Sequence, residues 1–163
     1  MDSGVGRMIK VNLTVVGKVR ESYIADGIEE YKKRLKKYCE FTITEIKEED
    51  LASESEAEIK RALKAEGSAI LKKVKGEYYV FALEGKSLSS EKFAEFFSTR
   101  INEGKEIELV IGSSYGLDDA VKNGAKGRIS LSEATFPHAL FRLIACEQIY
   151  RAFTIINGSA YHK

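Results

Sequence analysis

Several features that define common protein classes are missing from this sequence. Its two cysteines, Cys39 and Cys146, provide neither a disulfide framework nor a metal-binding spacing. No uninterrupted apolar run is long enough to cross a bilayer, and there is no charged-then-apolar leader with a small-residue cleavage site. We therefore expect a cytoplasmic protein that binds no metal and has no membrane partner.

An excess of charge of one sign is also missing. The formal net charge is +1 at pH 7, so the field of the whole molecule is too weak to indicate a polyanionic partner. A local patch would have to bind any nucleic acid. Such a patch is predicted on a helix at residues 23–38, where one side is basic: Lys32, Lys33, Arg34, Lys36 and Lys37. This side could grip an RNA backbone, although a solvated charged face is the commoner meaning of the pattern.

The composition indicates one folded domain. Hydrophobic residues make up 44% and charged residues 31% of the 163, a balance that is too apolar for disorder and suits a single core. The sequence has no internal repeat, low-complexity linker or break in composition. Residues 1–7 are small, glycine-containing and patternless, so we expect a disordered extension there and a single domain over residues 8–163.

Strand and helix patterns alternate along this domain. Strands are predicted at residues 8–16, 41–46, 78–83 and 107–112, and helices at residues 23–38, 53–75, 89–104 and 139–153. Ser53 with Glu56 indicates a capping box for the second helix, and Ser89 or Ser90 can cap the third. The alternation and the near-continuous apolar strands predict an α/β fold with a mostly parallel sheet and helices on both faces.

A parallel sheet of this kind binds ligands beyond the carboxyl ends of its strands, which carry Leu83, Gly112 and the stretch after Ile129. Two nucleotide-binding motifs are incomplete there. The triplet at residues 85–87 looks like the end of a phosphate-binding P-loop, but Val80 stands where that motif needs a glycine. The turn at residues 112–116 lacks the glycine spacing of a dinucleotide site. A glycine turn after a buried strand remains, and by itself such a turn is more often structural.

The most informative corner is Ser130-Leu131-Ser132-Glu133-Ala134-Thr135-Phe136-Pro137-His138, which contains the only proline and one of the two histidines. Proline suits a first helical turn because its missing N–H would have no intrahelical partner there, while the free N–H groups beside it are available to a ligand. We expect a backbone-lined pocket at this corner. The helix that follows is apolar around more of its circumference than one sheet can cover, so we expect a second chain against it.

Candidate functional side chains lie on this helix and after it. His138 and Arg142 are four residues apart and share a face, so they could address one ligand, although a capping or solvated pair is commoner. Glu147 and Arg151 have the same spacing and are interpreted as structural. The terminal residues 161–163 would normally fray in solvent, but an aromatic, histidine-bearing end could dock.

Three segments carry a family resemblance: residues 131–138 with Arg142, the run Glu147-Gln148-Ile149-Tyr150-Arg151-Ala152, and the closing Tyr161-His162-Lys163. With them the chain, from about Met8 to its end, resembles the SPOUT-superfamily methyltransferases that act on a pseudouridine of large-subunit ribosomal RNA. The resemblance implies an α/β fold with a C-terminal trefoil knot, which pattern reasoning alone would reject. It also implies a homodimer that transfers a methyl group from S-adenosyl-L-methionine to N3 of a pseudouridine in 23S RNA, within the ribosome or its large subunit.

The resemblance also implies the cofactor-binding positions, which are Leu83, Gly112, Leu131, Ser132, Glu133, Ala134, Thr135 and Phe136. The chain departs from the family's pattern in two places. Ser113 stands where a second glycine is common, and the turn that begins at Leu83 is one residue shorter than usual. The second departure puts the contact at Leu83 in doubt.

The expected chemistry needs a base or a cation, because an imide nitrogen must lose its proton before it attacks. Our candidates are His138, Arg142, Tyr161 and His162. We assign Arg142 to a carbonyl oxygen or phosphate of the target nucleotide and Tyr161 to stacking or closing the pocket, and leave the base open between the two histidines. The tail is expected to complete a partner subunit's site.

Two other functions stay open from the sequence. One is a SPOUT-like methyltransferase that acts on transfer RNA. The other is a non-enzymatic, nucleotide-binding module associated with the ribosome.

Overall fold

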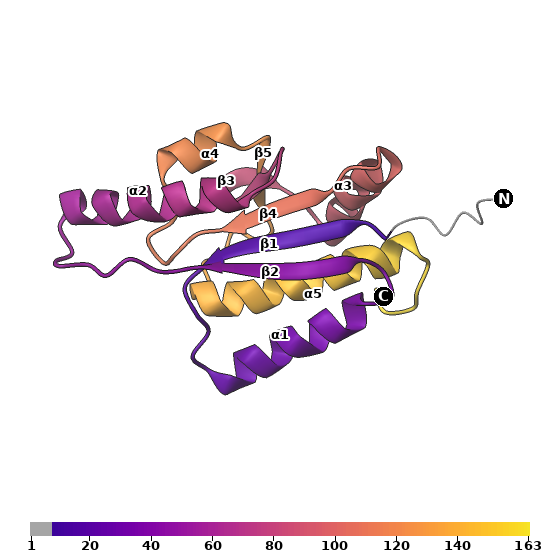
Figure 1. Ribbon diagram of the computed structural model, residues 1–163. Coiled ribbons are helices and arrows are strands. Elements are labelled where there is room, and N and C mark those ends of the chain that lie inside the picture. Colours follow the sequence, from indigo (N-terminus) through magenta and orange to yellow (C-terminus); the bar gives the residue numbers. More distant parts are fainter. Residues whose placement is uncertain (1–7) are drawn as a thin grey trace.

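The computed structural model describes residues 8–163, so the extension predicted at residues 1–7 lies outside the described residues. In the described part, strands and helices alternate (Figure 1) in the order β1 (Lys10–Val16), α1 (Ser22–Leu35), β2 (Glu40–Ile46), α2 (Glu56–Lys73), β3 (Tyr79–Ser87), α3 (Ser90–Asn102), β4 (Ile107–Ile111), α4 (Asp119–Gly124), β5 (Gly127–Ser130) and α5 (His138–Ile156). The predicted α/β alternation is confirmed.

The strands form one sheet in the order β2-β1-β4-β3-β5, and every pair in it is parallel. The central strand β4 is buried along its whole length, as expected for a strand that helices cover on both faces. All carboxyl ends therefore point to one edge of the sheet, where the loops after β3, β4 and β5 meet.

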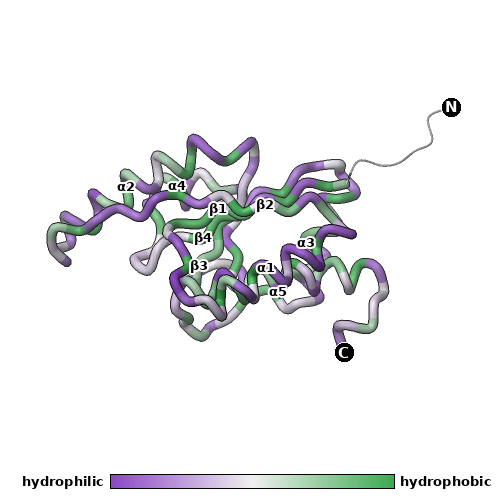
Figure 2. The backbone as a smooth tube through the Cα atoms, turned by 60° about the horizontal axis from the view of Figure 1, so that its bottom comes forward, coloured by the Kyte–Doolittle hydropathy of each residue, from purple (hydrophilic) through white to green (hydrophobic). Residues whose placement is uncertain are grey.

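Helices cover both faces of the sheet, as predicted (Figure 1). The larger core lies between the sheet and α1, α3 and α5, and its buried cluster includes Leu13 and Leu109 from the sheet and Phe93 and Phe97 from α3. The smaller core lies on the opposite face, under α2 and α4. Figure 2 shows the hydrophobic residues concentrated along the strands, with the hydrophilic ones on the outer helices.

Three details of the sequence-based prediction were wrong. The spacing S-x-x-E occurs twice in succession, and Ser55 rather than Ser53 caps α2, since its hydroxyl accepts a hydrogen bond from the Glu58 N–H at 3.2 Å. The first helix ends at Leu35 instead of Tyr38, because the chain turns there to enter β2. The short helix α4 was not predicted, since six residues are too few to display a helical period.

Candidate active site at the carboxyl edge of the sheet

A cavity of about 260 Å³ opens at the carboxyl edge of the sheet, between the loops after β3, β4 and β5. Apolar residues and small polar residues make up most of its lining. It is lined by Phe81, Ala82, Leu83, Glu84, Ile111, Gly112, Ser113, Ser114, Gly116, Leu117, Lys122, Ile129, Ser130, Leu131, Ser132, Ala134, Thr135, Phe136, His138 and Phe141.

The first wall is a bulge in β3. Phe81 and Lys86 both pair with Ile129, so residues 82–85 loop out of the sheet toward the cavity. Gly85 closes this bulge against β5, where a Cβ would lie 2.7 Å from the backbone of Arg128 and Ile129, and only glycine permits that approach. Leu83 is 58% exposed, so its apolar side chain stands at the rim of the cavity.

The second wall is the turn after β4. The N–H of Ser113 donates to the Gly116 carbonyl at 3.2 Å, and the N–H of Gly116 donates back to the Ser113 carbonyl at 2.9 Å. A side chain at Gly112 would collide with the carbonyl oxygen of Gly116. Gly116 itself has φ of +96°, a conformation that other residues rarely adopt. The tight turn thus requires both glycines, and Ser113 occupies it without strain.

The third wall is the corner between β5 and α5. The Ser130 hydroxyl donates to the Ser132 carbonyl at 2.9 Å, and the Ser132 hydroxyl accepts from the Ala134 N–H at 2.9 Å. Two serine side chains therefore shape the corner and leave most of its backbone open to a ligand. Pro137 is the residue immediately before α5, and its carbonyl accepts the first helical hydrogen bond, from Phe141.

A charged pair stands at the mouth of the cavity. The Glu84 carboxylate lies 3.4 Å from the Lys122 ammonium and 3.7 Å from the Arg128 guanidinium. A hydrogen bond from its own backbone N–H, together with these two cations, holds the pKa of the Glu84 carboxyl below its ordinary value. The mouth thus offers one carboxylate and one ammonium to a zwitterionic ligand.

The structure separates His138 from Arg142. His138 lines the cavity, whereas Arg142 is 3% exposed and donates from Nη2 to the carbonyls of Val16 and Gly17, at 3.2 and 3.0 Å. Burial lowers the pKa of this guanidinium, and its Nε has no partner among residues 8–163. In the single chain Arg142 therefore holds the end of β1 and does not share the cavity with His138.

The C-terminal tail folds back onto the second half of α5. The Tyr161 hydroxyl donates to Glu147 Oε1 at 3.1 Å and lies 3.4 Å from the Tyr31 hydroxyl, while the His162 ring contacts Arg151 and Glu91. Because α5 rises about 1.5 Å per residue, Glu147 and Arg151 lie roughly 14 and 20 Å along the helix from His138. Neither Tyr161 nor His162 lines the cavity of its own chain.

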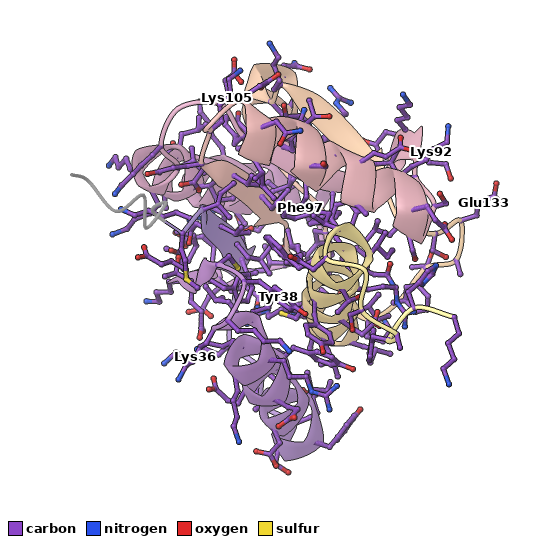
Figure 3. The ribbon with its side chains drawn as sticks, turned by 90° about the vertical axis from the view of Figure 1, so that its right-hand side faces the viewer. Lys36, Tyr38, Lys92, Phe97, Lys105 and Glu133 are labelled. Carbon is purple, nitrogen blue, oxygen red and sulfur yellow. The ribbon has the colours of Figure 1, made fainter. Side chains whose placement is uncertain are left out.

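Most predicted cofactor positions meet at the cavity: Leu83, Gly112, Leu131, Ser132, Ala134, Thr135 and Phe136 all line it. Glu133 does not, and Figure 3 shows its side chain projecting outward from the corner. Sequence reasoning missed the apolar floor formed by Phe81, Ile111 and Phe141, and it also missed Lys122 on α4. The predicted strand ends could have indicated Phe81 and Ile111. No pattern in the sequence indicated α4, and therefore none indicated Lys122.

Comparison with known proteins places this arrangement in a family. The family described as "Predicted SPOUT methyltransferase" matches residues 9–162. The chain belongs to the SPOUT methyltransferase family. Among the similar curated proteins is the ribosomal RNA large subunit methyltransferase H of Caldicellulosiruptor saccharolyticus, which is 48% identical over 96% of this chain and 100% of its own. The protein of that name from Limosilactobacillus reuteri is 46% identical over 95% of this chain and 100% of its own.

A solved structure of low sequence similarity supports the fold of this family member. The crystal structure of a putative methylase family protein from Neisseria gonorrhoeae superposes with a TM-score of 0.52 at 11% identity, covering 87% of this chain and 82% of that one. The trefoil knot implied by the resemblance stays a prediction. Between residues 8 and 163, no helix is long and apolar enough to span a bilayer, and no cluster of His, Cys, Asp and Glu is suited to a metal ion.

Proposed function

We propose that this chain methylates large-subunit ribosomal RNA, using S-adenosyl-L-methionine to modify N3 of a pseudouridine, and that it works in the cytoplasm as a homodimer on the ribosome or its large subunit. The observation that carries the proposal is the three-walled cavity at the carboxyl edge of the sheet, in a chain that belongs to a methyltransferase family. The curated relatives are named as ribosomal RNA large subunit methyltransferases.

The cavity fits the proposed cofactor. Phe81, Ile111 and Phe141 provide an apolar floor for a flat ring, and the walls after β4 and β5 present backbone groups that can hydrogen-bond to a nucleoside. The absence of a side chain at Gly112 lets the turn after β4 close against Gly116, which shapes this wall of the cavity. Glu84 and Lys122 at the mouth match the hydroxyl and amino-acid groups of such a molecule.

When bound, S-adenosyl-L-methionine supplies a methyl group on a sulfonium whose departure leaves a neutral thioether, so the protein has no leaving group to protonate. The chain's own task is alignment of the two reactants and removal of the imide proton. His138 lines the cavity and is one candidate for the base, and His162 in the tail is the other. Tyr161 would stack on the target base or close the pocket.

The position of the tail outside the cavity of its own chain supports a composite site in a dimer. Since Tyr161 and His162 do not line that cavity, they would act in the cavity of a partner. Leu140, Leu143 and Ile144 on α5 are only partly buried in the single chain and offer an apolar contact surface. A second hollow beside the cavity, lined in part by Leu88, Phe136 and Ile144, extends this surface.

The basic end of α1, defined as Lys33 together with Lys36 and Lys37 in the turn that follows, would bind the RNA backbone. Lys33, Lys36 and Lys37 are exposed and form no ion pair within the described residues, whereas Lys32 and Arg34 are paired with Glu29 and Glu30. Free cations of this kind release counterions from a phosphate backbone on contact. Since Tyr31 of α1 lies against Tyr161, this basic end adjoins the tail.

Methyl transfer tests the proposal directly. Labelled S-adenosyl-L-methionine is incubated with the protein and large ribosomal subunits, and the labelled nucleoside is identified by mass. The expected product is an N3-methylated pseudouridine. Label that appears only in transfer RNA would instead support a SPOUT-like tRNA methyltransferase, and cofactor binding that is absent altogether would support a non-enzymatic ribosome-associated module.

A further inference from the structure

Both ring nitrogens of His162 are occupied by groups with fixed hydrogen-bonding roles. Nδ1 lies 3.0 Å from Nη1 of Arg151, and Nε2 lies 2.8 Å from Oε1 of Glu91. A guanidinium has only N–H donors and keeps its charge at all ordinary pH values, while an ionised carboxylate only accepts. The two neighbours therefore dictate where the proton of the ring must be.

The consistent arrangement is a neutral ring with its proton on Nε2. Nδ1 must use its lone pair to accept the N–H of Arg151, and Nε2–H then donates to Glu91. Protonation of Nδ1 would place two N–H donors and two positive charges against each other, so the hydrogen bond with Arg151 would have to break. The only basic nitrogen of His162 is thus already engaged.

The partners of His162 are themselves held in place. Arg151 donates from Nε and Nη2 to Glu147 Oε1 at 2.9 and 2.5 Å, and its guanidinium lies 4.9 Å from the centre of the Tyr161 ring. The hydrogen bond to Glu147 raises the pKa of Arg151, and the hydrogen bond from His162 lowers the pKa of Glu91. Both partners stay charged near neutral pH, which keeps their roles fixed.

We propose that Arg151 and Glu91 are positioning residues that lock His162 in its neutral Nε2–H form. His162 then anchors the tail and so fixes the position of Tyr161, while His138 accepts the proton of the target base. This inference rests on the proposed methyl transfer. His138 lines the cavity, and no hydrogen bond within residues 8–163 engages its ring, so both of its nitrogens are available. The geometry thereby assigns different tasks to the two histidines.

The proton position can be measured without any turnover. The chain has two histidines, so protein labelled with ¹⁵N-histidine gives two ring systems, and the His138→Gln variant assigns them. Two-bond ¹⁵N–¹H spectra of the full-length protein at neutral pH distinguish a protonated ring nitrogen from a bare one. We expect His162 to be in the Nε2–H form. The Arg151→Met variant should give an average of the Nε2–H and Nδ1–H forms, and the Arg151→Lys variant, which keeps a donor, should restore the Nε2–H form. An Nδ1–H form or an imidazolium in the unmodified protein would overturn the proposal.

Kinetics then separate anchoring from proton transfer. A glutamine side chain can still donate to Glu91 but cannot act as a base, so His162→Gln should lower kcat by less than about tenfold. His138→Gln should lower it by about 10²–10⁴-fold, as expected when a general base is removed. The reverse pattern would overturn the assignment.

The ¹⁵N spectra must be interpreted with every titratable or charged group that faces His162. These are Glu91 on α3, Arg151 and Glu147 on α5, Tyr31 on α1 and the neighbouring Tyr161. If the unmodified protein transfers no methyl group, the proposed function fails, while the ¹⁵N spectra still decide whether Arg151 fixes the ring.

Discussion

The two ends of α5 build their sites in different ways. At its beginning, backbone turns and apolar side chains from three loops enclose a cavity, and His138 is the only ionisable residue that the helix adds to the lining. At its end, a charged and hydroxyl-bearing network ties the last residues of the chain to Glu147, Arg151 and Glu91. The first end suits recognition of a nucleoside by shape, whereas the second depends on a few exact hydrogen bonds.

This difference predicts how each end tolerates change. A cavity made by the fold disappears when the backbone cannot close its turns, but it tolerates exchange of single polar side chains. A tail held by a hydrogen-bond network detaches when any of its anchors is removed, while the rest of the fold stays intact because few buried residues depend on it. Mutations can therefore disable one end at a time.

Removal of residues 161–163 should have the largest effect. We expect turnover to fall at least about 100-fold, because the reacting groups of a composite site are no longer aligned, while the dimer stays folded. Methyl transfer under single-turnover conditions and sedimentation velocity measure the two quantities. Deletion of Lys163 alone is the control, since no hydrogen bond within residues 8–163 involves its side chain. A truncated protein that remains active would disprove the role of the tail.

Gly112→Ala should damage the other end. Its new methyl group collides with the Gly116 carbonyl, and forcing extra atoms into a packed site costs about 1–3 kcal/mol, so we expect cofactor affinity to fall about 10- to 100-fold. Titration calorimetry measures the Kd. Gly104→Ala is the control, because it adds a methyl that strains the backbone at a positive φ of +68° but lies away from the cavity. Equal reductions of affinity in both variants would show that strain, not the cavity, is responsible.

Arg142→Met should have an intermediate effect, which lowers the stability of the fold. The variant leaves the carbonyls of Val16 and Gly17 without their donor, so the free energy of unfolding should fall by about 1–3 kcal/mol in urea denaturation. This experiment also tests our sequence-based assignment of Arg142 to the target nucleotide. Unchanged stability with an abolished methylation rate would favour contact with the nucleotide over support of β1.

The basic end of α1 should make the smallest contribution. Replacing Lys33, Lys36 and Lys37 with glutamine should reduce the slope of log affinity against log salt by up to about 3, since each phosphate that is no longer neutralised accounts for about one unit. Filter binding to ribosomal RNA over a range of salt gives the slope. The control is glutamine at Lys60, Lys64 and Lys72 on α2, which lies on the opposite face of the sheet. An identical change in both variants would rule out a specific role of α1 in RNA binding.

The sequence predicted the layers of the fold because strand and helix periods are local properties. Leu13, Leu109 and Phe97 are buried as their patterns require. The strand order was not predictable, since alternation indicates parallel strands but does not say which of them are neighbours. The bulge at residues 82–85 was predicted only as a turn that ends the strand, because the sequence does not reveal that β3 resumes at Lys86 and pairs again with β5.

The site was predictable only in part, for a related reason. Gly112 and Leu131 follow strands whose ends must meet, so their convergence follows from a parallel sheet. The direction of Arg142 does not follow, because a position on a helix face does not reveal which partner the side chain takes. The docking of Tyr161 was likewise beyond local reasoning, which favours a frayed terminus.

The proposed activity is tested most directly by methyl transfer from labelled S-adenosyl-L-methionine to assembled ribosomes, large subunits, free ribosomal RNA and transfer RNA, compared in parallel. We predict label at N3 of a pseudouridine in large-subunit RNA. Measurable cofactor binding with no label in any of these RNAs would contradict the proposal.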